Sequence, residues 1–176
     1  MTSVRPTPAE VAAALPGDDR LDADVVMDRA FSLAAPPDVV WPWVLQLGRQ
    51  RAGWYFPRSV ERFFPHRRRG TRWIDPALQQ LAVGDVVPDW GGRDETLTVL
   101  AVAAPYSLLY GTQRDNIEMT WSLVLTPADR DTRVHSRVRL AGVRRRWLAE
   151  YGGGFFDWLT IAGLAGGLRE RVTRAP

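Results

Sequence analysis

Residues 117–140 read IEMTWSLVLTPADRDTRVHSRVRL, the most regular alternation of apolar and polar residues in the chain. Apolar and polar side chains alternate along 117–125, with Trp121 at the centre of the apolar face. The alternation returns along 132–140, after the turn-forming sequence PADRD. A period of two is typical of a strand that buries one face. We therefore expect an antiparallel hairpin with one buried face and one face in solvent.

The second face of this hairpin is polar. Along 132–140 it carries His135 and the arginines at positions 133, 137 and 139. We expect the arginines to form a solvated stripe that faces acids such as Glu118 on the neighbouring strand. His135 is then a solvent-facing residue and not a metal ligand or a general base.

More strands are expected on both sides of the hairpin. Runs with a period of two lie between turns rich in glycine and proline. These runs occupy 25–33, 83–90, 96–103 and 107–113. Together with the hairpin they predict an antiparallel meander.

Three helices are expected between and after the strands. Pro36-Pro37-Asp38 opens the first, which Gly48 ends, and a second short helix runs from about 57 to 64. The last occupies 155–172 and carries an apolar stripe at helical spacing. The order is strand, two helices, antiparallel strands and a long C-terminal helix, which is an α+β arrangement.

Five segments, in this order, carry a resemblance to a known family. They are APPDVVWPWVLQLG, RAGWY, LAVGDVVP, the Thr-Trp pair at 120–121 and GLRERV. The chain resembles the START-like helix-grip superfamily (SRPBCC), and within it the bacterial polyketide cyclase/dehydrase-like branch. The resemblance covers roughly residues 15–172.

The resemblance implies a helix-grip fold, in which a curved antiparallel sheet wraps around the long C-terminal helix and two short helices follow the first strand. The helix-grip domain would span 25–172. Residues 1–24 would form an N-terminal extension, with a short helix that the capping-box pattern at Thr7 begins.

The family's fold places a deep, mostly apolar cavity between the sheet and the last helix. The resemblance therefore implies binding of a hydrophobic, aromatic or polyketide/lipid-like small molecule in this cavity. The alternative is a polyketide cyclase or dehydratase that uses acid–base groups in the same cavity. The fold does not decide between the two, and the sequence leaves open whether the chain is an enzyme.

Large aromatic side chains are the main candidates for the cavity wall, because one sheet and one helix leave space that only large side chains can fill. The expected ligand-binding residues are Trp54, Tyr55, Trp73, Trp90, Tyr110, Trp121, Trp158 and Leu164. The alternative for Trp54, Tyr55 and Trp121 is packing in the core.

Tyr55 and Glu61 are the expected acid–base pair if the chain is an enzyme. A phenol can donate a hydrogen bond to a developing enolate, and a desolvated carboxyl can exchange a proton. The alternative for Glu61 is a surface ion pair with Arg58 or Arg62. Asp157 is a further polar group expected near the cavity.

Composition excludes several functional classes. The chain has no cysteine, so thiolate nucleophiles, disulfides and cysteine-based metal sites are excluded, and no metal or cofactor is expected. All 23 basic residues are arginine, the formal net charge is +3, and no nucleic-acid-binding motif accompanies them. The longest apolar stretch, 155–168, is too short to span a bilayer and no signal peptide precedes the domain, so a cytoplasmic location is expected without membrane insertion.

Arginine clusters at 66–70 (HRRRG) and 144–147 (RRRW) are the main charged features. We expect them either to be solvated loops or to lie at the cavity mouth. At the mouth they could guide an anionic ligand or an acidic partner such as an acyl carrier protein. The oligomeric state does not follow from the sequence.

Overall fold

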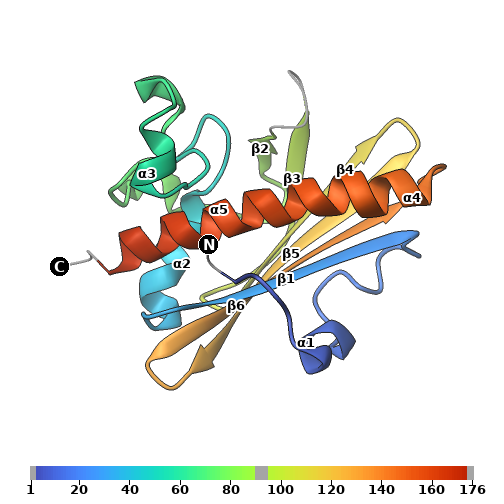
Figure 1. Cartoon of the computed structure of the whole chain (residues 1–176), viewed down its shortest axis with the longest axis horizontal. Coiled ribbons are helices and arrows are strands. Elements are labelled where there is room, and N and C mark those ends of the chain that lie inside the picture. Colours follow the sequence, from blue (N-terminus) through green and yellow to red (C-terminus); the bar gives the residue numbers. More distant parts are fainter. Residues whose placement is uncertain (1–2, 90–94, 174–176) are drawn as a thin grey trace.

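Six antiparallel strands form one curved, open sheet, and a long helix crosses in front of it (Figure 1). The structure is a computed structural model, and it describes residues 3–89 and 95–173. The strand order is β1-β6-β5-β4-β3-β2, so the first strand of the chain lies beside the last. The strands are β1 (Val25–Leu33), β2 (Val86–Pro88), β3 (Thr96–Ala103), β4 (Ser107–Arg114), β5 (Ile117–Ala128) and β6 (Asp131–Ala141).

The helices lie before, between and after the strands. They are α1 (Pro8–Ala12), α2 (Pro37–Gln46), α3 (Arg58–Glu61), the 3-10 turns η1 (His66–Arg68) and η2 (Pro76–Leu78), α4 (Arg146–Leu148), the π-helical turn η3 (Ala149–Gly153) and α5 (Gly154–Val172). This is the expected helix-grip arrangement. None of the helices in 3–89 and 95–173 is long and apolar enough to cross a membrane.

The sheet's concave face is apolar because the strand registers align apolar residues across neighbouring strands. Trp121 of β5 lies opposite Tyr110 of β4 on one side and Val138 of β6 on the other. Leu123 and Leu125 of β5 are buried on the same face. The alternation that predicted the hairpin therefore places Trp121 toward the core.

Helix α5 packs on this face through its second half. Leu164, Ala165 and Leu168 are buried, and glycines replace larger residues where the loop after α2 passes. A Cβ atom at Gly167 would lie 2.5 Å from the carbonyl carbon of Tyr55, and one at Gly163 would lie 2.4 Å from the ring of Phe56. Both glycines permit a close approach of helix and loop.

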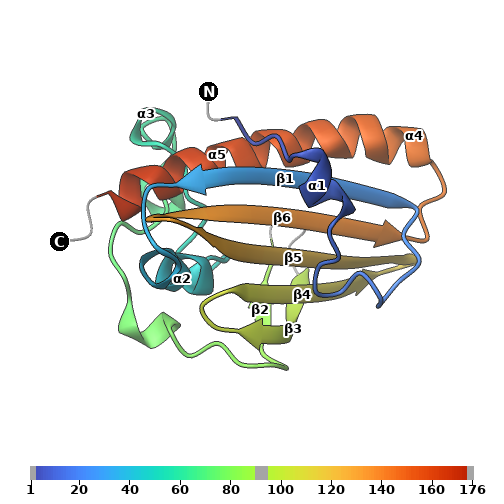
Figure 2. The same cartoon turned by 90° about the horizontal axis from the view of Figure 1, so that it is seen from below.

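The convex face of the sheet is covered, which corrects the expectation of a solvent-exposed polar face. The N-terminal segment with α1 lies over β1 and β6 (Figure 2). Beneath it His135 is only 5% exposed, and its Nε2 lies 2.6 Å from Oδ1 of Asp28. Arg137 is buried as well and donates to Asp28 and Asp18 at 2.8 and 2.6 Å. Alternation showed that the two faces differ in polarity, but it could not show what covers each face.

The arginines of β6 also have other partners than expected. Arg133 pairs with Glu10 at 2.6 Å, and Arg139 lies 3.5 Å from Asp18. The acids come from the N-terminal segment and β1, and Glu118 is not a partner in these ion pairs. The residues before β1 therefore cover the outer face of the sheet and form ion pairs with the arginines of β6.

Candidate functional site

Three aromatic rings form a continuous stack between the sheet and α5. The ring centroids of Trp54 and Trp121 are 6.0 Å apart with an interplanar angle of 26°. Those of Trp121 and Tyr110 are 5.6 Å apart at 24°. Tyr110 and Trp121 come from paired positions on β4 and β5, whereas Trp54 comes from the loop after α2. We call these three residues the aromatic stack.

Hydrogen bonds fix two rings of the aromatic stack. The indole Nε1 of Trp54 donates to the carbonyl of Thr160 on α5 at 3.1 Å. The indole Nε1 of Trp121 donates to Oγ of Ser136 on β6 at 3.0 Å. Because a loop, two strands and the helix all contribute, the orientation of the rings depends on the whole fold.

A tight loop brings Trp54 to this position. Gly48 and Gly53 form an isolated antiparallel bridge, in which the Gly53 amide donates to the Gly48 carbonyl at 2.9 Å. Gly53 has a φ of +80°, a conformation that side chains with a Cβ disfavour. The loop reverses the chain within a few residues, so that Trp54 turns toward the sheet.

The hydroxyl of Tyr110 is the unexplained polar group of the aromatic stack. Tyr110 is 2% exposed, and its hydroxyl has no hydrogen-bond partner among the residues that the structure describes. Burial raises the pKa of Tyr110 to about 12, against an opposing effect of the Arg51 charge. The phenol is therefore a neutral donor that needs an acceptor.

Arg51 is the second donor left over in this region. Its NH2 group donates to the carbonyls of Leu45 and Leu78 at 3.1 and 2.9 Å. Its Nε is buried without a partner in the described part of the chain. Buried donors of this kind are uncommon in native structures and often mark an absent water or ligand. The sequence does not single out Arg51, because nothing in the local pattern distinguishes it from the neighbouring Arg49.

The border of the aromatic stack is apolar and partly exposed. The partly exposed residues that pack against the core here are Trp54 itself, Met119, which lies two positions before Trp121 on β5, and Val138, which lies opposite Trp121 on β6. Aromatic and thioether groups of this kind suit contact with a flat apolar molecule.

Tyr55 is placed in the core. It has no exposed surface, and its hydroxyl donates to the carbonyl of Trp43 at 3.0 Å. Burial raises the pKa of this phenol above its ordinary range. The guanidinium of Arg171 lies over its ring, 4.3 Å from the centroid.

Glu61 is buried too, in a cluster of arginines that differs from the expected surface pair. Its Oε1 accepts from Arg171 at 2.9 Å and its Oε2 from Arg72 at 2.5 Å. Burial acts to raise the pKa of Glu61, but the bonds from Arg171 and Arg72 outweigh it and hold the pKa below its ordinary value. Glu61 is thus an ionised carboxylate. Arg58 and Arg62 precede and follow it but are not its partners in these bonds.

Arg171 contacts both expected catalytic residues, Tyr55 and Glu61, but the two side chains do not face a common cavity. Besides Glu61 and the ring of Tyr55, it donates to the carbonyls of Thr71, Gly167 and Gly70. Apart from Gly167 on its own helix, these partners lie roughly a hundred residues away along the chain, so no local sequence signal could have revealed this cluster. The arrangement fastens the end of α5 to the loops after α2.

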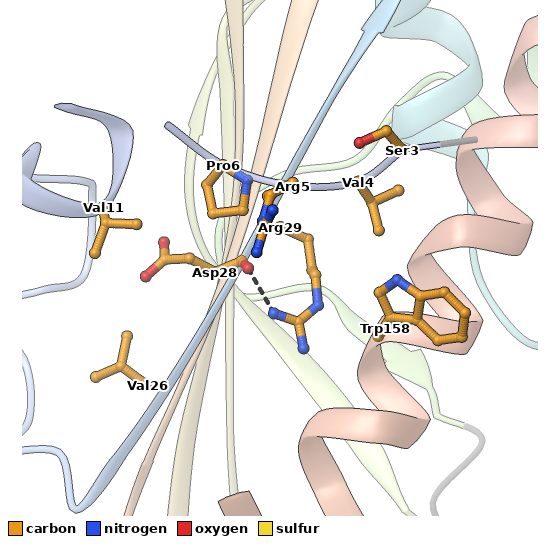
Figure 3. A pocket seen from close by; sticks show the side chains of 9 residues that line it. All are labelled: Ser3, Val4, Arg5, Pro6, Val11, Val26, Asp28, Arg29 and Trp158. Atoms are coloured by element: carbon orange, nitrogen blue, oxygen red, sulfur yellow. Dashed lines mark hydrogen bonds between the residues drawn. The ribbon is translucent and has the colours of Figure 1, made fainter. Parts of the chain in front are cut away.

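Two surface hollows contain further expected residues. One lies between the N-terminal coil, β1 and α5, where Arg29 and Trp158 border it (Figure 3). The other contains Trp73, Glu61 and the side chains of Arg58, Arg62 and His66.

Asp157 lies beside the first hollow's Arg29. Its Oδ2 is 3.0 Å from the Arg29 Nε. Burial raises the pKa of Asp157 to about 6, against the opposing effect of Arg29. This carboxyl can therefore change its protonation state near neutral pH.

The expected wall residues thus lie in several places. Trp54, Tyr110 and Trp121 meet in the aromatic stack, and Trp158 borders the first hollow. Tyr55 and Leu164 are in the core, and Trp73 is exposed on the second hollow. Trp90 lies outside the described residues. The two arginine clusters lie at opposite ends of α5 instead of around one mouth (Figure 1). No group of three or more His, Asp or Glu in 3–89 and 95–173 is arranged to hold a metal ion.

Comparison with solved structures identifies this architecture. The protein NE0264 from Nitrosomonas europaea superimposes with a TM-score of 0.53 at 21% identity, over 85% of this chain and 97% of that chain. Ms6760 from Mycobacterium smegmatis gives a TM-score of 0.51 at 17% identity, over 88% and 95% of the two chains. The fold is the helix-grip fold.

Another helix-grip structure is DynU16, described as a protein of the dynemicin biosynthetic locus. It superimposes with a TM-score of 0.50 at 20% identity over 86% of this chain. The match covers 48% of the DynU16 chain, so this chain corresponds to about half of it. At such identities the likeness concerns the fold alone. No family model and no curated protein matches the sequence.

Proposed function

We propose that this helix-grip protein binds a hydrophobic, ring-containing small molecule against the aromatic stack, between the sheet and α5. The observation that carries the proposal is the unpaired hydroxyl of Tyr110 at the buried end of the stack. A ring of the ligand would lie against Trp54, the ring at the partly exposed end of the stack, because stacked aromatic pairs gain stability beyond simple burial. An oxygen of the ligand would accept from Tyr110.

The two buried donors without partners, the Tyr110 hydroxyl and the Arg51 Nε, indicate which polar group the ligand carries. Tyr110 and Arg51 each have a hydrogen to donate, so a carbonyl or hydroxyl oxygen is the group that would satisfy them. Polyketide-like molecules combine rings with such oxygens. The shared fold with DynU16, from a biosynthetic locus, agrees with a ligand of this kind.

Fluorescence titration tests the binding proposal. Naringenin, which carries rings and a ketone, should quench the tryptophan emission saturably, whereas decanoate, which has no ring, should not. Tyr110→Phe should weaken naringenin binding about tenfold, because one hydrogen bond to a buried donor is lost. Trp73→Phe is the matched control, since Trp73 is 64% exposed and outside the stack, and it should leave the affinity unchanged.

Stability of the free protein supplies an independent check. If no water occupies the site, Tyr110→Phe should raise the free energy of unfolding by about 1 kcal/mol, because an unsatisfied buried hydroxyl is removed. Absence of saturable quenching by ring compounds would refute the proposal. So would a Tyr110→Phe variant that is less stable and binds with the same affinity.

A second candidate function is acid–base catalysis of the polyketide cyclase or dehydratase type. Asp157 favours it, since a carboxyl with a pKa of about 6 can both take and give a proton near neutral pH. Tyr55 and Glu61 remain the earlier candidates for this chemistry, although both side chains already have structural partners. Delivery of the substrate in the cytoplasm by an acyl carrier protein, received at an arginine cluster, belongs to this candidate.

Turnover of a poly-β-ketone analogue distinguishes the enzyme from the carrier. Asp157→Asn should lower the rate about a hundredfold or more while binding persists, if Asp157 exchanges the proton. Tyr55→Phe and Glu61→Gln test the other two residues in the same assay. A rate unchanged in all three variants would leave binding as the function.

A further inference from the structure

The first half of the C-terminal helical region carries an unusual amount of exposed apolar surface. Six large apolar side chains between positions 147 and 159 are exposed by nearly half or more. They are Trp147 (62%), Leu148 (50%), Tyr151 (78%), Phe155 (64%), Phe156 (67%) and Leu159 (45%). We call these six residues the aromatic patch. A contiguous exposed apolar surface of this kind marks a contact site.

Positive charge lies directly beside the aromatic patch. Arg144 and Arg145 precede it and are exposed, whereas Arg146 pairs with Asp24. Within residues 144–159 the acids are Glu150 and Asp157, and Asp157 is already matched by Arg29. The patch is thus bordered by cations that a partner of opposite charge could neutralise.

We propose that the aromatic patch binds peripherally to an anionic lipid surface, with the arginines at the headgroups and the aromatic side chains at the acyl boundary. Segments that lie in a membrane interface combine Arg or Lys with Trp, Phe and Leu in this way. Trp and Tyr in particular prefer the level of the headgroups. The proposal requires no helix that spans the bilayer.

Charge and composition favour lipid over the other occupants. A two-fold contact with a second copy would pair two identical surfaces, and within 144–159 that surface offers Arg144 and Arg145 only Glu150 as an acid not already matched by Arg29. An acidic protein surface would pair with the arginines, but it would not bury most of the six apolar side chains of the aromatic patch. An anionic bilayer satisfies both, since it presents negative charge above hydrocarbon.

The aromatic patch is continuous with the first hollow, which lies beside β1. The rings of Phe155 and Trp158 are 5.9 Å apart, and Trp158 borders the hollow next to β1 (Figure 3). Lipid binding does not require a ligand at the aromatic stack, so the proposal stands independently of the proposed function.

Co-sedimentation with vesicles tests the proposal on the full chain. The wild type should sediment with vesicles of phosphatidylglycerol and phosphatidylcholine but not with phosphatidylcholine alone, and salt at about 0.5 M should weaken the binding. Arg144→Gln with Arg145→Gln should weaken it roughly thirtyfold, given the usual contribution of two cations near an anionic surface. Phe155→Ser with Phe156→Ser should weaken it more than tenfold.

The other end of α5 supplies matched controls. Arg67 and Arg68 are also exposed, and Phe63 is 73% exposed beside them. Arg67→Gln with Arg68→Gln, and Phe63→Ser, should leave vesicle binding unchanged. Equal losses in these controls would show general charge attraction and overturn the proposal.

Hydrogen exchange on the wild type avoids dependence on variants that fail to fold. Anionic vesicles should protect amides within 144–159 and leave the rest of the chain unchanged. Failure to sediment with anionic vesicles, or protection elsewhere only, would overturn the proposal. A concentration-dependent dimer that the phenylalanine variants abolish, without lipid binding, would instead show self-association.

Discussion

The two halves of α5 have similar residues and opposite surroundings. In the second half Leu164 is buried, Gly167 touches the loop after α2, and Arg171 is enclosed by carbonyls and Glu61. In the first half Leu159 and two phenylalanines are exposed, and just before the helix, at Gly153 of η3, a Cβ atom would meet nothing within 4 Å. Whether a residue of α5 is buried therefore depends on the segments that cover it, and α3 and the loops cover only one end of the helix.

The largest effect is expected from removing the buried cation of the covered half. Arg171→Leu leaves Glu61 with Arg72 alone and leaves several buried carbonyls unpaired, so the free energy of unfolding should fall by about 3–5 kcal/mol. Arg169→Leu, at an exposed position two residues earlier, should cost less than about 1 kcal/mol. Urea denaturation of both variants measures the difference, and equal losses would contradict the contrast.

A pair of leucine-to-alanine substitutions tests the same difference between the two halves of α5 with uncharged side chains. Leu164→Ala should destabilise the protein by about 2–5 kcal/mol, because the cavity it leaves is enclosed by the core. Leu159→Ala removes the same atoms from a side chain that is 45% exposed, and it should change stability by less than about 1 kcal/mol. Thermal unfolding of the pair checks the expected order.

The glycines should respond with opposite signs. Gly167→Ala forces a methyl group to within 2.5 Å of the Tyr55 backbone, so it should destabilise by about 1–3 kcal/mol despite the better helix propensity of alanine. Gly153→Ala meets no neighbour within 4 Å and has helical φ and ψ of −64° and −45°, so it should stabilise by up to about 1 kcal/mol. If both substitutions changed the free energy of unfolding with the same sign, the expected difference between the two positions would be contradicted.

The smallest effects concern the pH dependence of stability at the two ends. The lowered pKa of Glu61 contributes stability above the carboxyl's unfolded pKa, and this stability is lost as the pH falls through the folded value. The raised pKa of Asp157 has the opposite sign, since stability falls as the pH rises from about 4 to about 6. Glu61→Gln and Asp157→Asn should each remove their own slope from the curve of unfolding free energy against pH. A curve that neither variant alters would contradict both pKa shifts.

The elements of the fold could be predicted from the sequence because each has a local pattern. The period of two in β1, β5 and β6 marked their paired strands, and the stripe in 155–172 marked α5. The prediction that His135 faces solvent was wrong, because the sequence of β6 does not show that the N-terminal segment covers the outer face of this strand.

The candidate site was less predictable for a related reason. Trp54, Tyr110 and Trp121 were chosen for their residue types, and the stack depends on the loop turn at Gly53 and the register of two strands. The Arg171–Glu61 contact and the unpaired Nε of Arg51 depend on long-range packing that neither propensity nor spacing encodes.

The pairing of β1 with β6 also sets the order in which the chain can assemble. The residues of β1 leave the ribosome early, yet their partners, from Thr132 to Leu140, follow roughly a hundred positions later. Long-range pairing of this kind slows folding, and an unpaired strand edge invites association with other chains while it waits. The meander from β3 to β5 can form hairpin by hairpin, whereas the edge strand must wait until β6 has been synthesised. The nascent chain can therefore complete its native sheet only after β6, the last strand, has been synthesised.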